Sequence, residues 1–378
     1  MKKFSVFFFV LAVLCAGCHS TGGTASPYTV TSVYEGVDWV TFGQYKAGLH
    51  AHTINSTESS GIDPLSSVIF EHYDKGYHIL AITDHNFLTE SWVSAPDGIT
   101  QEQYDAIANG TYKNRGFGML EIPDSNEQSR REHVNTFMVK YNNANPAVMD
   151  MAELIAHIES LGGLSHVNHP GRYTGGMREN PDSPSDASFD AARIDLYTKI
   201  FMANPFCVGM EIINKKDDES RSDRILWDNI LQRTIPQGRN VWCFSSDDTH
   251  ANADTGFSFN IFVMPENTLE NFRAAMYAGH FYAVARVARR EGFPRLGPSD
   301  NLTIATPAIT GIIVENPGII SITAENHTRI DWISNGNVIF TGDTINVNNV
   351  KGPIGSYVRA NVIGPGGVAF TQPFVIEK

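Results

Sequence analysis

Residues 63–86 read DPLSSVIFEHYDKGYHILAITDHN, and this stretch decides the fold. Its opening Asp-Pro pair predicts the start of a helix, and Gly76 predicts the end of it. The apolar run 77–83 is typical of a buried strand. Asp84 and His85 follow that strand directly, so a helix and a strand lead to two metal-capable side chains.

The same alternation of helix and strand continues along the chain. Asp150 and Glu153 predict a capping box for a helix that ends at Gly162. Further strands are predicted at 164–167, 206–213 and 241–245, and further helices at 223–232 and 269–277. Short buried strands that alternate with helices predict a parallel sheet, either open or closed into a barrel.

The pattern changes after Pro298. The runs that follow are short, rich in β-branched residues and separated by Gly, Asn and Pro, as at 319–324, 330–334, 338–340 and 357–363. This pattern predicts that residues 298–378 form an all-β, sandwich-like domain, with the barrel at 37–297. The stretch 86–117 has no clear period and is interpreted as a lid or a surface loop.

The N-terminus has the order of an export signal: basic residues, the apolar run 4–16, then Gly17 and Cys18. That run is shorter than the roughly 20 apolar residues that span a bilayer. The segment 14–18 resembles the lipobox of bacterial lipoproteins. The resemblance implies that Cys18 is acylated and anchors the protein in the bacterial cell envelope, on its periplasmic or surface face; plain signal cleavage remains the alternative. Residues 19–36 are then expected to be a flexible tether.

The net charge argues against a nucleic-acid-binding protein, and the cysteine content argues against a disulfide-rich one. Without Lys2 and Lys3, 28 − 2 = 26 basic side chains face 41 acidic ones, a net charge of −15, which argues against generic nucleic-acid binding. Only Cys207 and Cys243 remain beyond the signal, too few for a disulfide framework. We interpret both as buried thiols on strands.

Metal-capable side chains stand at the ends of the predicted strands. In parallel α/β sheets these ends converge on one face, so such residues are expected to share one crevice. Residues two apart on a strand point to the same side, which lets the pairs at 50 and 52 and at 248 and 250 each hold an ion. The residues concerned are His50, His52, Asp84, His85, Glu121, His133, His166, His169, Glu211, Asn214, Asp247, Asp248 and His250. Other histidines, such as His72, His78, His157, His280 and His327, are interpreted as packing or surface residues.

Mixed imidazole and carboxylate ligands suit zinc, manganese or iron. A carboxylate such as Glu121 is able to bridge two ions, so two or three divalent ions are expected. Glu211 has two interpretations, a cap at the end of its strand or a contact to substrate.

These residues resemble the PHP superfamily, named for polymerase-associated and histidinol phosphatase domains. The matching motifs cover roughly residues 45–255 in the family's order: Gly-Leu-His50-Ala-His52-Thr, Ile-Thr-Asp84-His85-Asn, the Glu121 strand, His133, His169-Pro-Gly-Arg-Tyr173 and Asp248-Thr-His250. The resemblance implies a distorted (β/α)7 barrel, followed here by the all-β domain.

The resemblance also implies three ion sites. The first would use His50, His52, Glu121 and Asp248, the second Glu121, His133 and His169, and the third His85 and His250. Relatives complete the third site with a His or Asp, where this chain offers only Glu58, so its occupancy stays open. Asp84, Asp247 and His166 are expected to orient imidazoles. Arg172 is expected to bind a substrate phosphate, with a salt bridge to an acidic neighbour as the alternative.

The expected function is a metal-dependent phosphoesterase that cleaves a small phosphate monoester or diester with a metal-bound hydroxide. His166 is a candidate proton donor to the leaving group. Two alternatives remain: a carbamate or ester hydrolase on the same metal centre, and a non-catalytic envelope lipoprotein that binds a glycan or a partner.

Overall fold

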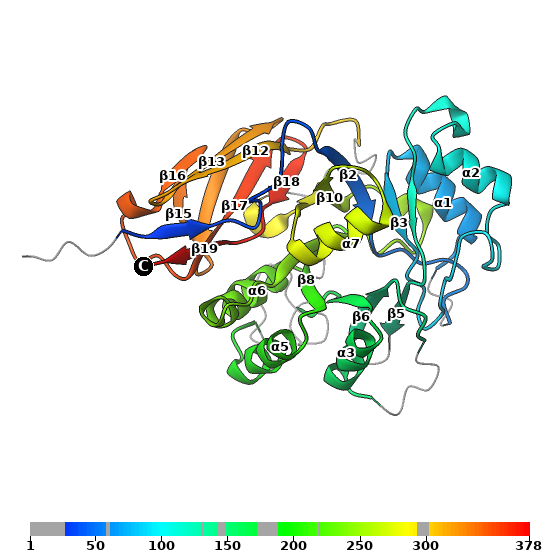
Figure 1. The fold of residues 1–378 in the computed structure, drawn as a ribbon, viewed down its shortest axis with the longest axis horizontal. Coiled ribbons are helices and arrows are strands. Elements are labelled where there is room, and N and C mark those ends of the chain that lie inside the picture. Colours follow the sequence, from blue (N-terminus) through cyan, green and yellow to red (C-terminus); the bar gives the residue numbers. More distant parts are fainter. Residues whose placement is uncertain are drawn as a thin grey trace, which may run out of the picture.

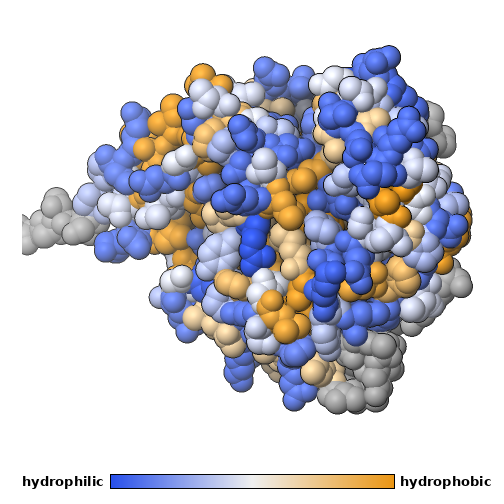
Figure 2. All heavy atoms as spheres, turned by 45° about the vertical axis from the view of Figure 1, so that its right-hand side comes forward, coloured by the Kyte–Doolittle hydropathy of each residue, from blue (hydrophilic) through white to orange (hydrophobic). Residues whose placement is uncertain are grey.

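The computed structural model describes residues 27–57, 61–129, 132–142, 149–171, 188–217, 220–292 and 302–378. In these ranges it is a mixed α/β protein with a β-rich C-terminal part, as the sequence predicts (Figure 1). None of the helices in these ranges is long and apolar enough to cross a membrane. Figure 2 shows hydrophobic side chains on one face in small separate groups among hydrophilic ones.

The first sheet begins with parallel strands. Strand β2 pairs with β3, and β3 pairs with β4, while β10 and β11 extend the same sheet with antiparallel pairing. The bounds of these strands are β2 Gly43–Gly48, β3 Ile79–Ala81, β4 Leu120–Ile122, β10 Ser258–Met264 and β11 Phe281–Ala285. Through these antiparallel strands the sheet continues into the C-terminal part of the chain.

A second, five-stranded sheet runs from β5 to β9 in chain order. Its strands are β5 Asn126–Ser129, β6 His133–Phe137, β7 Leu164–Val167, β8 Cys207–Asn214 and β9 Trp242–Ser246, of which β7, β8 and β9 are parallel. Isolated bridges link the two sheets at Ala51–Thr249 and His85–Glu127. The carboxyl ends of their parallel strands therefore meet.

Among the described strands, backbone ladders form separate sheets and do not by themselves close the distorted (β/α)7 barrel that the resemblance implies. Strand β9 meets β10 and β11 through side chains: Asn260 Oδ1 accepts from the Ser245 amide at 3.0 Å, and Ser245 Oγ donates to the Val284 carbonyl at 2.8 Å. Because β10 already pairs with β2 and β11 on its two edges, it has no free edge to offer β9. Side-chain hydrogen bonds replace a backbone ladder at this seam.

The helices cover the outside of the sheets (Figure 1). Helix α3 begins with the predicted capping box of Asp150 and Glu153, and α7 ends at Gly279, whose φ of 81° suits glycine. The stretch 86–117 contains a helix that the sequence did not predict, although Thr100 and Gln103 form its capping box. The six α-helices of the described ranges are α1 Leu65–Asp74, α2 Gln101–Ala108, α3 Met151–Ser160, α5 Ala191–Ala203, α6 Arg221–Thr234 and α7 Leu269–Ala278.

The C-terminal part is a sandwich whose larger layer continues the first sheet. Strand β18 pairs with β11, while β12, β13 and β16 form the other layer. Buried side chains of both layers, such as Ile322 and Trp332, share one core cluster. The strands are β12 Ala308–Glu315, β13 Ile319–Glu325, β14 Arg329–Ser334, β15 Asn337–Thr341, β16 Thr344–Asn346, β17 Tyr357–Gly364, β18 Gly367–Phe370 and β19 Phe374–Glu377.

Part of the expected tether belongs to this sandwich. Thr29–Thr31 form strand β1, which pairs with β19 and lies in blue among the orange and red strands of Figure 1. The Tyr34 hydroxyl donates to the Phe281 carbonyl at 3.0 Å and accepts from the Gln372 amide at 2.9 Å. The assignment of residues 19–36 to a flexible tether is therefore wrong for 29–34, whose Ser- and Thr-rich composition also suits an edge strand.

Candidate metal centre

The His-x-His pair stands at the carboxyl end of β2. The backbone there is fixed by the amide of His52, which donates to the Thr249 carbonyl at 2.8 Å. The rings of His50 and His52 are fully buried, and their centroids are 5.0 Å apart. Both rings point into the junction between the two sheets, as the spacing predicts.

Glu127 on β5 is the central carboxylate of the site. Its Oε2 lies 2.7 Å from His85 Nε2, and its Oε1 lies 2.9 Å from His133 Nδ1. His50, His52 and His169 place a ring nitrogen within 3.3, 3.8 and 3.7 Å of the same carboxylate. Glu127 is thus the carboxylate shared among the imidazoles.

The sequence analysis gave this role to Glu121, and the structure places Glu121 elsewhere. On β4 its carboxylate accepts a hydrogen bond from the backbone amide of Trp92 and interacts with the Tyr104 hydroxyl, and Glu121 belongs to none of the described groups of potential metal ligands. The chain turns at Asp124, which has a φ of 51°, before Glu127 enters the site on a separate short strand. The sequence did contain a signal for Glu127. This carboxylate stands six residues before His133, on the strand that forms a hairpin with the strand of His133.

Asp248 holds the other side of the cluster. Its Oδ1 lies 3.0 Å from His52 Nε2 and 3.3 Å from both His50 Nε2 and His250 Nδ1. The residue is buried and has a φ of 46°, a left-handed backbone conformation that Asp tolerates better than most residues. Lys215 contributes a cation at the rim, 3.4 Å from Asp248 Oδ2.

Glu211 contacts two of the histidines, His50 through its ring and His169 through its backbone amide. Its Oε1 accepts from His50 Nδ1 at 2.8 Å, and its Oε2 accepts from the His169 amide and from Asn214 Nδ2, both at 2.9 Å. A carboxylate on Nδ1 leaves His50 Nε2 to face the cluster, which is the arrangement that orients metal-binding histidines. Glu211 thus has a role that neither of its two interpretations, a strand-end cap or a contact to substrate, had named: it orients His50.

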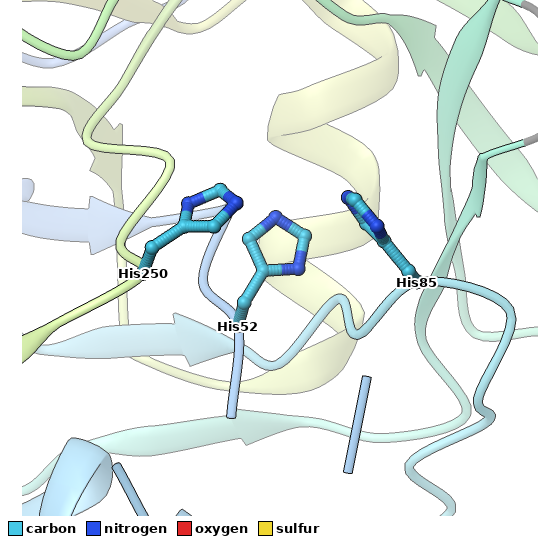
Figure 3. A group of neighbouring side chains, drawn as sticks. All are labelled: His52, His85 and His250. Atoms are coloured by element: carbon cyan, nitrogen blue, oxygen red, sulfur yellow. The ribbon is translucent and has the colours of Figure 1, made fainter. Parts of the chain in front are cut away.

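Among the described residues, four groups of three side chains have ligand atoms within 4.8 Å of one another. In Figure 3 the rings of one group, His52, His85 and His250, come from three separate segments and point into a common space. The other groups are His50 with His52 and Asp248, His50 with His169 and Glu211, and His85 with Glu127 and His133. The structure therefore brings together all the predicted His and Asp ligands and adds Glu127 and Glu211.

The donor set fits divalent cations. His50 Nε2, Glu127 Oε2 and Asp248 Oδ2 are buried without a hydrogen bond of good geometry among the described residues. A buried polar atom in that state costs free energy unless another ligand satisfies it. Imidazole nitrogens and carboxylate oxygens at this density suit zinc, manganese or iron.

The charge states also suit cations. Burial would raise the pKa of Glu127 and Asp248, but the imidazoles around them hold both values well below the ordinary range. Burial lowers the pKa of His52 to about 3 and lowers that of His133 as well, while the carboxylates outweigh burial at His50 and raise its pKa. Ionised carboxylates and the neutral imidazoles of His52 and His133 are the forms that ligate metals, and a bound cation would take the place of the proton on His50.

Two aspartates that were expected to orient imidazoles have different positions. Asp84 accepts from the Thr53 hydroxyl and the Ser56 hydroxyl, both at 2.8 Å, and Ser56 Oγ lies 3.4 Å from His52 Nδ1. Asp84 therefore supports the site through Ser56. Asp247 instead accepts from the Tyr77 hydroxyl and from three backbone amides at 256–258, so it stabilises a loop and does not contact the imidazoles.

His166 lies inside the protein between aromatic rings. Its ring stacks on Phe244 at a centroid distance of 4.5 Å and meets Phe137 at 5.4 Å. Burial lowers its pKa to about 4, so it is neutral at pH 7 and has no proton to give as an imidazolium. The structure favours packing for His166, in place of the proton delivery that we expected.

Three predicted residues lie outside the described ranges: Glu58, Arg172 and the lipidation candidate Cys18. Cys207 and Cys243 are buried free thiols on β8 and β9, as predicted.

No family model and no curated protein matches the sequence. Among solved structures, the fold is similar to a two-domain protein from Bacteroides vulgatus, described as containing a predicted PHP-like metal-dependent phosphoesterase, with 15% identity, a TM-score of 0.45 and coverage of 89% of this chain and 96% of that one. It is also similar to a lesion-specific endonuclease from Pyrococcus furiosus, at 16% identity and a TM-score of 0.38, over 68% of this chain and 60% of that one. An amidohydrolase from Chromobacterium violaceum matches at 15% identity and a TM-score of 0.32, over 54% of this chain and 87% of that one.

Proposed function

We propose that this chain is a metal-dependent hydrolase that cleaves small phosphate monoesters or diesters. The observation that carries the proposal is Glu127, a buried carboxylate within 4 Å of five imidazoles. Neighbouring groups that share His50, His52 and His85 would hold two or three ions. Zinc, manganese and iron are the candidates.

Divalent ions in such a site supply an activated water and neutralise charge on a phosphoryl group. The chain's own part is to position ligands and substrate. Glu211 and Asp84 fix the imidazole rings, directly and through Ser56. Lys215 at the rim supplies positive charge for an anionic substrate, and we propose the same role for Arg172.

The proposed reaction does not need a covalent nucleophile from the protein. Burial raises the pKa of both Cys207 and Cys243 to about 12, so neither thiol is a nucleophile at neutral pH. Positioning and charge neutralisation account for most of the catalysis of phosphoryl transfer, and the site offers both.

The proposal is tested by elemental analysis together with hydrolysis of aryl phosphate, aryl phosphodiester and aryl carbamate. We expect two or three ions per chain and phosphate-selective turnover that is lost in His52→Ala. His327→Ala, which replaces a histidine of the sandwich, is the matched control and should retain both. Turnover of carbamate alone would instead support the carbamate or ester hydrolase, and a metal-free, inert protein would support the non-catalytic lipoprotein.

We also propose that the protein is exported and anchored to the bacterial cell envelope through acylated Cys18. The proposal rests on the order of residues 1–18. Membrane fractionation of wild type and Cys18→Ser tests it: the wild type should sediment with membranes and the variant should be released. Equal release of both would favour plain signal cleavage.

A further inference from the structure

A second cavity lies at the opposite end of β3 and β4 from the metal centre. Its volume is about 490 Å³. His78 immediately precedes β3 and Glu121 lies on β4, whereas His85 follows β3 at the end that carries the metal cluster. The cavity is lined by Tyr45, His78, Tyr104, Ala108, Phe117, Gly118, Met119, Leu120, Glu121 and Asn267.

Four of the ten lining residues carry rings: Tyr45, His78, Tyr104 and Phe117. His78 meets Tyr45 edge-on at a centroid distance of 5.9 Å and packs against Phe117 at 4.9 Å. Tyr104 on α2 adds a third aromatic residue beside Glu121. Burial and the charge of Lys46 lower the pKa of His78, so this ring is neutral at pH 7 and does not repel a cation.

Glu121 places a carboxyl group in this wall without a cationic partner. Its side chain is 8% exposed, and its polar contacts are the Trp92 amide and the Tyr104 hydroxyl. No ion pair to Glu121 occurs within the part of the chain that the structure describes. Lys46, on the neighbouring strand β2, does not serve as this partner: its Nζ lies over the Tyr77 ring, 3.9 Å from the centroid.

The surroundings of Glu121 increase the demand for positive charge. Burial, with a further contribution from the Asp124 carboxylate, raises the pKa of Glu121 to about 7 against the hydrogen bonds from Trp92 and Tyr104. A cation entering the cavity would stabilise the ionised carboxylate. Aromatic faces would at the same time attract that cation through their quadrupoles.

We infer that this cavity is a binding site for an organic ammonium ion, such as a choline-type headgroup, held between the aromatic wall and the Glu121 carboxylate. An aromatic wall with a single buried carboxylate is suited to a bulky, weakly hydrated cation, because such an ion contacts several rings and needs few hydrogen bonds. The site is separate from the metal centre and does not depend on the proposed hydrolase activity.

The test is calorimetric titration of the full chain with choline and with its neutral isostere 3,3-dimethylbutan-1-ol. We expect choline to bind at least about tenfold more tightly than the isostere, because the shapes match and only the charge differs. Glu121→Gln and Phe117→Leu should each weaken choline binding by about tenfold or more. The matched control is Glu102→Gln, which removes an exposed carboxylate from the same helix as Tyr104 and should bind choline as wild type does.

Equal affinity for choline and the isostere, or no binding of either by the folded wild type, would overturn the inference. Circular dichroism of each variant separates loss of the site from loss of the fold. Because binding is measured as heat and not as turnover, an inactive hydrolase would leave this result unaffected.

Discussion

Two buried polar clusters in this protein are built on opposite principles. Between α6 and β17, Asp228 accepts two hydrogen bonds from Arg359 and one from the Tyr357 hydroxyl, all at 2.8 Å. Arg359 completes its set with Asn361 Oδ1 at 2.8 Å. In the metal centre, by contrast, three carboxylates share six imidazoles, and several atoms of the cluster lack a hydrogen bond of good geometry.

The pattern of hydrogen bonding distinguishes a structural cluster from a functional site better than burial does. Both clusters are largely buried and rich in ionisable groups, although His133 and His250 of the metal centre are partly exposed. In the Asp228 cluster each donor faces an acceptor, which is what a structural ion pair between two layers requires. In the metal centre acceptors outnumber donors, which leaves room for cations. We therefore expect substitutions in the first cluster to change stability and substitutions in the second to change metal binding.

The largest effect is expected from Asp228→Ala. It would leave the Arg359 guanidinium buried without a counter-charge, and breaking such a pair costs about 3–5 kcal/mol of unfolding free energy. Denaturant titration measures the loss. The control is Asp195→Ala, which removes the partner of Arg233 at the surface and should cost less than about 1 kcal/mol. Similar losses in the two variants would contradict a structural role for the buried cluster.

Glu127→Gln should reverse this pattern. Loss of the shared carboxylate is expected to lower metal content and to reduce turnover by more than about 100-fold, the upper range for groups that only support ligands. The unfolding free energy measured in chelator should fall less than in Asp228→Ala, because glutamine keeps an acceptor for Asn168 and loses only the charge that the imidazoles stabilise. Full metal content in this variant would show that Glu127 is not the central ligand.

Glu211→Gln sharpens the comparison inside the metal centre. Glutamine keeps an acceptor for the His169 amide but removes the charge that orients His50. We expect metal affinity to fall by about 10- to 100-fold, as for other groups that hold a ligand in place. Competition with a chromophoric chelator measures this change. A loss as large as that of Glu127→Gln would make Glu211 a direct ligand.

The smallest effect is expected from Glu121→Gln. Since folding raises the pKa of Glu121 from 4.5 to about 7, its ionisation destabilises the fold; the effect is absent below about pH 4.5, grows with pH and is complete above pH 7. The variant should therefore melt a few degrees above wild type at pH 8 and equally at pH 4.5. Metal content should match wild type, whereas loss of metal would restore Glu121 as a ligand.

The sequence predicted most of the elements because their signals are local. Capping residues at Asp150 and glycine at Gly279 mark helix ends that the structure reproduces. The His and Asp ligands were predictable because they end buried strands. Strand pairing is not local, and the extension of β2 by antiparallel β10 could not be read from either strand alone.

The error at Glu121 has the same origin. Both Glu121 and Glu127 lie on short strands before His133, and the sequence does not say which side of each strand faces the imidazoles. The chain bends at Asp124 between them. The central role was therefore assigned to Glu121, a carboxylate six residues before Glu127 that lines another cavity.

Strand β1 imposes an order on folding. It pairs Thr29 with Glu377, so this part of the sandwich closes only after β19 has been synthesised. Contacts so distant in sequence form late and slowly, because the intervening chain must first be ordered. Until then the edge of β19 that β1 covers stays open to pairing with other chains. The protein should consequently depend on protection from aggregation until β1 and β19 pair.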